Sequence, residues 1–518
     1  MPFLSAPPQI RLHKAFTTPF RNTVATARTC YSSKGIIDDG AVGDREKFSP
    51  LAKSIYEAGH HTTFQHAHFQ FAMENVSRQF IWSFLHAHPF YNSEQVSQRY
   101  VTVKPDTMTT PQLPTPEAQT LFARTAEAQF AAYQELCEVL LGPADAAFHA
   151  RFPRSERMAK KHAVAKKKKA QEIARYVLPV GTTAYLYHTI SAVTLLRYWR
   201  VCEQQDVPDE TRAIVGEMVR QLLEFDPDYE ITLQEPLDPA AFPEAEFFAN
   251  EPQLLSGAKA TAFRAEFDAA LDGRTSRLVG WSPQAESLVA DAVREVIGLT
   301  RADLKDAEAI RLALDPGRNR LLGESLNLTT VSKLSRALFH AHYTFKKKIS
   351  HTADSQDQRH RMTPASRPIL AAHVDAEPDY ITPQLIEMDD TAARIYSGIM
   401  EQSWNAMEKL RTLGAAPEHI LYLLPNAASV RFTESADLLN LRHKHEMRLC
   451  YNAQEEIWKA SVDEADQIRA VQPNIGRYLL PPCTLRAMAG TKPICPEGAR
   501  YCGVRVWTMD LSEYDRVI

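Results

Sequence analysis

The feature that most constrains the fold of this chain is an order of short motifs that occurs twice along its 518 residues. In each half a Ser-Arg dipeptide is followed by a His-Ala-His triplet, a polar segment with arginine, an apolar segment ending in Leu-Pro, and an arginine-bearing helix. The paired segments are Ser77-Arg78 with Ser335-Arg336, 86–88 with 340–342, 93–100 with 354–360, and 174–179 with 420–425. Such a repeat predicts two related domains produced by duplication.

Hydrophobic periodicity predicts a helix-rich protein. Apolar residues recur at helical spacing over 116–151, 169–204, 210–224, 258–313, 383–412 and 435–470. The two segments that end in Leu-Pro are strand-like, and the proline-rich text at 232–256 is typical of a linker. We therefore expect an α+β fold with a small mixed sheet in each of two domains. The expected domains are 1–235 and 306–518, the second with a cysteine-containing extension, joined by a helical connector at 236–305.

Composition excludes several classes of protein. Lys+Arg number 59 and Asp+Glu 63, giving a net charge of −4, so no general field attracts nucleic acid or an anionic membrane. The lysine run at 160–169 lacks interleaved aromatic residues and is more typical of a solvated helix face. Without a long apolar segment, a signal sequence or a glycine-rich phosphate loop, we expect a cytoplasmic protein that binds neither membrane nor nucleic acid.

The seven cysteines are odd in number, which does not fit a disulfide framework. Cys483, Cys495 and Cys502 cluster near the carboxyl terminus, where three thiolates could hold Zn²⁺ if a fourth ligand came from elsewhere. Structural free thiols are the favoured interpretation, and no metal is predicted.

Four polar residues of the first half suggest a site for an anion. Ser97, Arg99, Arg175 and Arg200 lie in separate segments, each beside an apolar stretch that could fix its position. Guanidinium groups with a hydroxyl are well suited to holding a phosphate. By residue type alone, surface or interface ion pairs explain such arginines more often than an anion site does.

The segments 27–31, 58–71, 76–78, 97–101 and 174–179 resemble flavin-dependent thymidylate synthases. In the second half the matching segments are 423–426, Arg448 and 453–457. The resemblance implies reductive methylation of dUMP, with methylenetetrahydrofolate as the carbon donor, NADPH as the electron donor and FAD as the cofactor. A flavin carries the difficult chemistry in such enzymes, so no protein nucleophile is required.

The resemblance also implies roles for individual residues. The substrate would be bound by Gln95, Ser97, Arg99, Arg175, Arg200 and Arg359. Arg200, Arg448 and Ser97 would act in catalysis, with Arg200 polarising the pyrimidine. The cofactor would be held by His60, Thr62, Gln65, His66, Arg78, His86, His88, Lys347, Asn426 and Arg442.

The chain departs from the family pattern in both halves. His86-Ala87-His88 stands where the family has Arg-His-Arg, Gln65 replaces a glutamate, and Leu421-Tyr422 stands where Ala-Arg is expected. Asp357 takes the place of a serine. Because neither half is complete, we expect the two halves to share one site, with Lys347, Arg359, Arg442 and Arg448 replacing lost charge. A homodimer would then act as a pseudo-tetramer.

Two other functions are compatible with the sequence. The altered signature could serve flavin-dependent modification of another pyrimidine nucleotide. Alternatively, the chain could be a catalytically silent nucleotide-binding relative.

Overall fold

The computed structural model describes residues 3–86, 90–151, 159–204, 206–250 and 258–516. Each half contains one four-stranded sheet, with strand order β1-β2-β4-β3 in the first half and β5-β6-β8-β7 in the second. The identical order confirms an α+β fold of two related domains. Every neighbouring pair of strands is antiparallel, so neither sheet is mixed as the sequence led us to expect.

The first half begins with a long strand and ends with a helix that covers its sheet. Its strands are β1 (Gln9–Ala15), β2 (His68–Ser77), β3 (Tyr91–Gln95) and β4 (Thr183–Ser191). Its helices are α1 (Pro19–Thr29), α2 (Arg45–Glu57), α3 (Arg78–His86), α4 (Pro116–Val139), α5 (Leu141–Arg151), α6 (Ala159–Ala174), α7 (Ala192–Arg200) and α8 (Pro208–Phe225).

The second half repeats this arrangement after two connecting helices, α9 (Pro243–Asn250) and α10 (Ala258–Leu271). Its strands are β5 (Ser276–Trp281), β6 (His342–Ser350), β7 (Ala365–Ser366) and β8 (Ser429–Asp437). Its helices are α11 (Ala285–Ile297), α12 (Asp306–Leu314), α13 (His351–Asp357), α14 (Gln384–Glu387), α15 (Asp390–Thr412), α16 (Pro417–Leu421), α17 (Leu438–Arg448), α18 (Glu455–Val471), α19 (Pro473–Gly476) and α20 (Pro482–Ala489).

Three expectations about local structure were wrong. The helix expected over 169–204 is interrupted by β4, where buried and exposed side chains alternate as on a half-buried strand. The Leu-Pro segments are not strands, since they form a 3₁₀ turn at Arg175–Val177 and helix α16. The connector expected at 236–305 contains β5, which pairs with β6, so the second sheet begins before residue 306.

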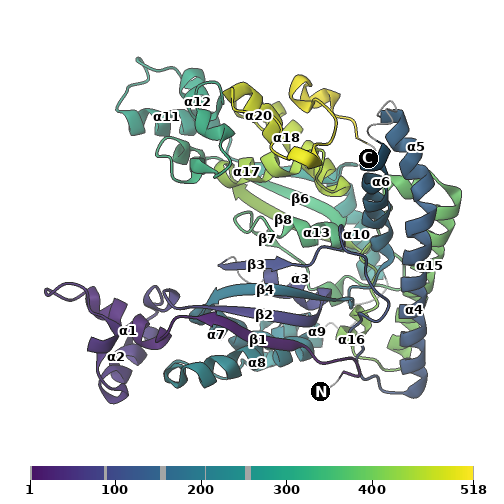
Figure 1. Cartoon of the computed structure of the whole chain (residues 1–518), viewed down its shortest axis with the longest axis horizontal. Helices are drawn as coiled ribbons and strands as arrows, with labels where there is room; N and C mark the ends of the chain where they lie inside the picture. The colour runs from purple at the N-terminus through teal and green to yellow at the C-terminus, as the bar shows by residue number, and fades with distance from the viewer. Residues whose placement is uncertain (1–2, 87–89, 152–158, 205, 251–257, 517–518) are drawn as a thin grey trace.

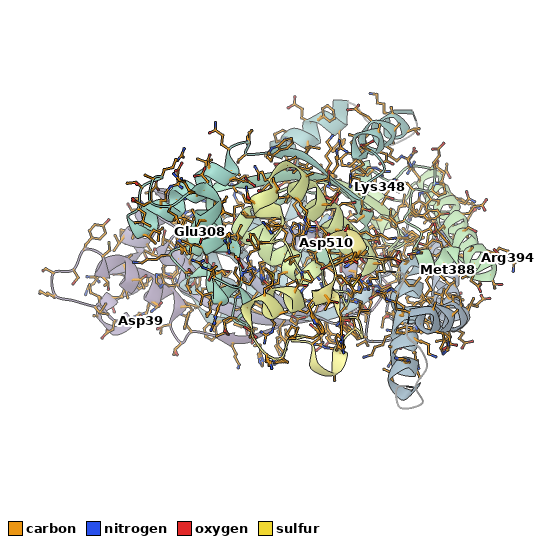
Figure 2. The ribbon with its side chains drawn as sticks, turned by 90° about the horizontal axis from the view of Figure 1, so that it is seen from above. Asp39, Glu308, Lys348, Met388, Arg394 and Asp510 are labelled. Carbon is orange, nitrogen blue, oxygen red and sulfur yellow. The ribbon has the colours of Figure 1, made fainter. Side chains whose placement is uncertain are left out.

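The two halves share one hydrophobic core, which extends from the first sheet through α4 to α15. Figure 1 shows the two sheets one above the other, with α4 and α15 running alongside both. Seen from above, the loop with Asp39 and helix α15 with Arg394 lie at opposite ends of the molecule, and the segment with Asp510 lies over its middle (Figure 2). A second core fills the space between β5, β6, α11 and α18.

The two halves are joined by a set of backbone hydrogen bonds in which each half donates N–H groups to the other. The N–H···O=C bonds run from Val180 to Leu424, Gly181 to Tyr422, Asn426 to Leu178 and Ala427 to Tyr176, with N···O distances of 2.8–2.9 Å. Pro179 and Pro425 face each other at the centre. A Cβ atom on Gly181 would lie 2.7 Å from the Tyr422 carbonyl oxygen, so this approach requires glycine.

Side-chain hydrogen bonds are exchanged between the halves in the same way. The Tyr176 hydroxyl donates to Glu456 in the first turn of α18, and the Tyr422 hydroxyl donates to Glu210 in the first turn of α8, at 2.8 Å. All four side chains are buried. The contact is therefore isologous, as in a two-fold symmetric dimer, although both partners belong to one chain.

Over the described residues, every helix is too short or too polar to cross a lipid bilayer.

Candidate functional site

A cavity of about 1170 Å³ lies between the two halves. The segment after β3 and the turn at Arg175 form its first wall, and the end of α13 with α17 forms the opposite wall. Seven arginines but only two glutamates line it, which makes it strongly positive. Such a cavity favours an anionic ligand.

One end of this cavity holds Arg99 and Arg175 around the buried carboxylate of Glu172. Arg99 pairs with Glu172 through Nε and donates from Nη2 to the Asn452 carbonyl oxygen of the second half at 3.0 Å. The Arg175 side chain is only 4% exposed and donates from Nε to the Glu172 carbonyl oxygen at 3.1 Å. Ser97 accepts from the Arg99 N–H at 3.2 Å.

The charge of Glu172 stabilises this arrangement. Burial alone would raise its pKa, but Arg99 and Lys169 hold the pKa far below its ordinary value. Burial lowers the pKa of Arg175, because its guanidinium has lost water and lies near Arg99. The site therefore contains a desolvated cation that an anionic ligand would stabilise.

Four buried N–H donors that line the cavity have no acceptor among the described residues. They are Arg78 Nε, Gln98 Nε2, Arg175 Nη2 and Gln356 Nε2. Buried donors rarely remain without a partner, since each costs free energy when unsatisfied. The set consists of donors, so the complementary ligand is rich in acceptor atoms.

The second wall is centred on Arg448. Its Nε donates to His360 Nε2 at 2.8 Å, and its Nη2 donates to the Gln356 carbonyl oxygen at 2.9 Å. Burial lowers the pKa of Arg448 to about 10, so the side chain remains charged at neutral pH. His360 is neutral there, because burial and Arg448 lower its pKa.

Asn426 links the two walls. Its amide Nδ2 donates to Gln98 Oε1 at 3.2 Å and to the Arg175 carbonyl oxygen at 3.0 Å. At the rim, Arg359 pairs with Glu94 at 2.5 Å, and both side chains are exposed. Arg361 lies over the Tyr91 ring, 5.2 Å from its centroid.

The cavity brings together nine of the residues that the sequence nominated. These are Gln65, Arg78, Gln95, Ser97, Arg99, Arg175, Arg359, Asn426 and Arg448. They come from both halves, in agreement with the shared site that the sequence suggested. His88 lies outside the described residues.

Several nominated residues lie elsewhere. Arg200, the expected pyrimidine contact, ends α7 and donates to the Glu235 carbonyl oxygen. His60, Thr62 and His66 are exposed and do not line the cavity of this chain. The Arg200 side chain is held by the Glu235 carbonyl and does not line the cavity of this chain.

His86 and Arg442 are engaged in contacts inside the protein. His86 packs against Trp82 and lies 3.5 Å from Asp354, and burial lowers its pKa to about 3. Arg442 pairs with Glu446 at 3.0 Å. These side chains are engaged within the protein and do not reach the cavity.

Lys347 is also internal. Its Nζ lies 3.2, 3.0 and 2.7 Å from carboxylate oxygens of Asp357, Glu434 and Glu464. Buried and exposed residues alternate along β6, and this alternation turns Lys347 inward.

Equivalent buried positions differ sharply between the halves. The sixth residue of β4, the seventh of α7 and the seventh of α3 are His188, Tyr198 and Phe84, whereas those of β8, α17 and α13 are Glu434, Lys444 and Asp357. The aromatic side chains of the first set pack against one another, and the ring centroids of Phe84 and Tyr198 are 4.3 Å apart. The second set is a buried ion network.

The counterpart of the Glu172 site in the other half has lost its cations. Leu421 precedes Tyr422 as Arg175 precedes Tyr176, and Glu418 lies at the position equivalent to Glu172. Burial raises the pKa of Glu418 to about 7, although the Asp209 backbone N–H, which donates to this carboxylate at 3.1 Å, opposes the effect. The two equivalent sites are therefore unequal, and the arginine-lined site is the one suited to an anion.

Gln98, Gln356 and His360 are among the polar residues of the cavity that sequence reasoning missed. Gln98 stands between Ser97 and Arg99, so its place within the quoted motif was an available signal. Nothing local distinguishes Gln356 or His360, because their role depends on Arg448 from another helix.

Comparison with known proteins now connects this geometry to a family. The model of the thymidylate synthase complementing protein family matches residues 11–228 and again residues 277–474. The chain belongs to this family. The two matches confirm the resemblance and the tandem duplication inferred from the repeated motifs.

Individual members of the thymidylate synthase complementing protein family show modest identity. A flavin-dependent thymidylate synthase of Clostridium tetani is 26% identical over 226 residues, covering 42% of this chain and 84% of the relative. One from Geobacter sulfurreducens is 29% identical over 170 residues, covering 32% and 70%. A solved structure of a UMP/dUMP methylase PolB from Streptomyces cacaoi with 5-Br dUMP aligns at 17% identity and a TM-score of 0.32, covering 46% and 96%.

Proposed function

We propose that the chain is a flavin-dependent thymidylate synthase that methylates dUMP to dTMP, with methylenetetrahydrofolate and NADPH as co-substrates and FAD as the cofactor. Membership of the thymidylate synthase complementing protein family supports this proposal. The observation that carries it is the arginine-lined cavity with four unsatisfied buried N–H donors.

In this proposal the nucleotide phosphate binds at Arg99, Arg175 and Ser97. The Arg175 Nη2 atom has no acceptor, and a phosphate oxygen would supply one. Glu172 fixes Arg99, so its guanidinium needs little reorganisation when the ligand binds. Both arginines belong to the first half, and Asn452 of the second half orients one of them.

Arg448 is the proposed catalytic residue in place of Arg200. It is charged and partly buried, and it faces the cavity from the second half. A fixed cation in a dry site stabilises negative charge that develops on a pyrimidine carbonyl. His360, neutral and hydrogen-bonded to Arg448, holds the guanidinium in place.

The residues present fit a flavin with a diphosphate. The cavity exceeds the roughly 300–1,000 Å³ of a pocket for one drug-sized ligand, so two ligands can share it. Arg78 has a free Nε donor, and Arg359 and Arg361 carry charge at the rim. A bound flavin would supply the electron and carbon transfer, while this chain binds and orients the nucleotide.

A catalytically silent nucleotide-binding relative is the second candidate. One specific observation favours it, because His86, assigned by resemblance to flavin binding, is committed to a buried contact with Asp354. Flavin binding therefore discriminates between the two functions.

The first experiment is purification of the full chain with added FAD, followed by absorbance spectroscopy with and without dUMP. The enzyme is expected to retain flavin and to show a spectral change with dUMP. It should then form dTMP from dUMP, methylenetetrahydrofolate and NADPH, detected by mass spectrometry. A chain that cannot be reconstituted with FAD would refute the proposal, and a product formed only from another pyrimidine nucleotide would reassign the substrate.

A matched pair of variants tests the choice of catalytic arginine. Arg448→Ala is expected to abolish dTMP formation, whereas Arg200→Ala is expected to keep it. The reverse result would restore the assignment made from sequence. We also propose a cytoplasmic homodimer that acts as a pseudo-tetramer, in which His60, Thr62 and His66 would face a second chain. Light scattering of the purified protein measures this state.

A further inference from the structure

Four of the seven cysteines surround one small cavity beneath the carboxyl-terminal segment. Cys450 follows α17, Cys483 lies in the first turn of α20, and Cys495 and Cys502 follow that helix. The remaining lining is mostly prolines, tyrosines and valines. All four cysteines are free thiols. The chain thus folds three separate segments to bring four sulfur atoms around one apolar space.

The thiols are buried and influence one another. Burial raises the pKa of Cys450 to about 12, and the nearby Cys502 and Cys483 thiols raise it further. Burial raises the pKa of Cys483 to about 11, with Cys502 and Cys495 adding to the effect. Four neighbouring thiols that share one pocket are the donor set of a soft metal centre, which binds them as thiolates.

The backbone supplies donors to the sulfur atoms. The N–H groups of Asn452 and Thr484 hydrogen-bond to Cys450 and Cys483 and oppose the effect of burial on the pKa of each thiol. Hydrogen bonds to cysteine sulfur stabilise the thiolate form and tune iron–sulfur clusters. These hydrogen bonds offset the effect of burial only in part, since the pKa of both thiols stays above its ordinary value.

A buried arginine provides a counter-charge. Arg516 is 9% exposed, and its Nε and Nη1 atoms have no hydrogen-bond acceptor among the described residues. Burial lowers its pKa, while Glu172 and Cys450 favour its charged form. Its charge in turn favours the thiolate of Cys502. The Arg516 guanidinium is therefore close enough to Cys450 and Cys502 to favour negative charge on these two sulfur atoms.

The spacing of the sulfur atoms distinguishes between kinds of metal centre. In a zinc site, Zn–S bonds of about 2.3 Å place the four sulfurs about 3.8 Å apart. Among the described residues, the group of three or more ligand atoms lying within 4.8 Å of one another is Asp209, Glu418 and His419, so no three of these thiols are that close. In a [4Fe–4S] cluster each thiolate binds a different iron, so the four sulfurs are further apart than in a zinc site.

We propose that Cys450, Cys483, Cys495 and Cys502 bind an iron–sulfur cluster. Four cysteine thiolates are the common ligand set of such clusters. Cys450, Asn452, Pro482 and Glu497 also line the large cavity between the halves. The cluster therefore lies directly beside the proposed nucleotide and flavin site, although the cysteine site itself does not depend on that function.

The test starts with the full-length protein, produced in iron-replete cells and purified without oxygen. Iron, acid-labile sulfide and zinc are quantified per chain, and electron paramagnetic resonance is recorded after reduction. We expect iron and sulfide in equal amounts and a cluster signal upon reduction. A protein with zinc and no iron, or one that takes up no iron and sulfide on anaerobic reconstitution, would overturn the proposal.

Matched cysteine variants test the ligands. Cys495→Ser and Cys502→Ser are expected to lose most of the iron and sulfide, whereas Cys202→Ser, a buried cysteine outside this group, is expected to retain both. Full iron and sulfide content in both ligand variants would contradict the assignment. Neither ligand residue lines the large cavity, so dUMP binding reports whether each variant is folded.

Discussion

Replacing Arg175 by alanine is expected to weaken dUMP binding without weakening the binding of deoxyuridine, which lacks the phosphate. The side chain is 4% exposed, and its Nη2 atom has no acceptor within the part of the chain that the structure describes. A hydrogen bond between a charged donor and phosphate contributes about 1.5–3 kcal/mol. This corresponds to a loss of affinity of about 10- to 140-fold.

The substitution is not expected to unfold the protein. Burial lowers the pKa of Arg175, which shows that the fold bears a cost for holding this cation. Its removal leaves Glu172 paired with Arg99 and Lys169. The melting temperature of Arg175→Ala should therefore stay close to that of the natural protein.

Isothermal titration calorimetry of both ligands measures the effect. Arg359→Ala is the matched control, because its guanidinium is half exposed and already paired with Glu94. We expect at most about a fivefold loss in that variant, since exposed pairs contribute about 1 kcal/mol or less. Equal losses in the two variants, or an equal loss for deoxyuridine, would refute the placement of the phosphate at Arg175.

Three further predictions test other parts of the structure. Arg200→Ala should change dUMP affinity by no more than about twofold in the same titration, because the side chain bonds the Glu235 carbonyl and does not line the cavity. Tyr422→Phe removes a donor from the buried Glu210 and should lower the free energy of unfolding in urea by about 1.5–3 kcal/mol, and an unchanged value would contradict the docking contact. Glu418→Gln should stabilise the protein at pH 8 by up to about 3 kcal/mol and have no effect near pH 4. The folded state raises the pKa of Glu418 from 4.5 to about 7, so the ionised side chain destabilises the fold increasingly as pH rises through that interval. A stabilisation by Glu418→Gln that does not depend on pH would contradict this explanation.

The sequence was informative where function depends on motif order. Ser97, Arg99 and Arg175 lie next to recognisable segments, and Arg448 lines the same cavity from the other half. Arg99 could be predicted as a site residue from the sequence alone, because its neighbours along the chain form a recognisable motif.

The sequence was misleading where a side chain's partner lies far along the chain. Lys347 resembles a free cation locally, yet its charge is neutralised by Asp357, Glu434 and Glu464 from other elements. Cys450 had no visible relation to the terminal cysteines, because the fold alone brings α17 beside that segment. In both cases the partners of the side chain are set by long-range packing, which a local sequence pattern does not encode.

The exchange of contacts around Pro179 and Pro425 has a consequence for a chain that carries both partners. Separate subunits come apart on dilution, whereas partners on one polypeptide stay at a fixed high effective concentration. A substitution in a homodimer also appears twice, but here each copy can change alone. Because each copy can change alone, matching positions can carry aromatic rings in one half and charged side chains in the other.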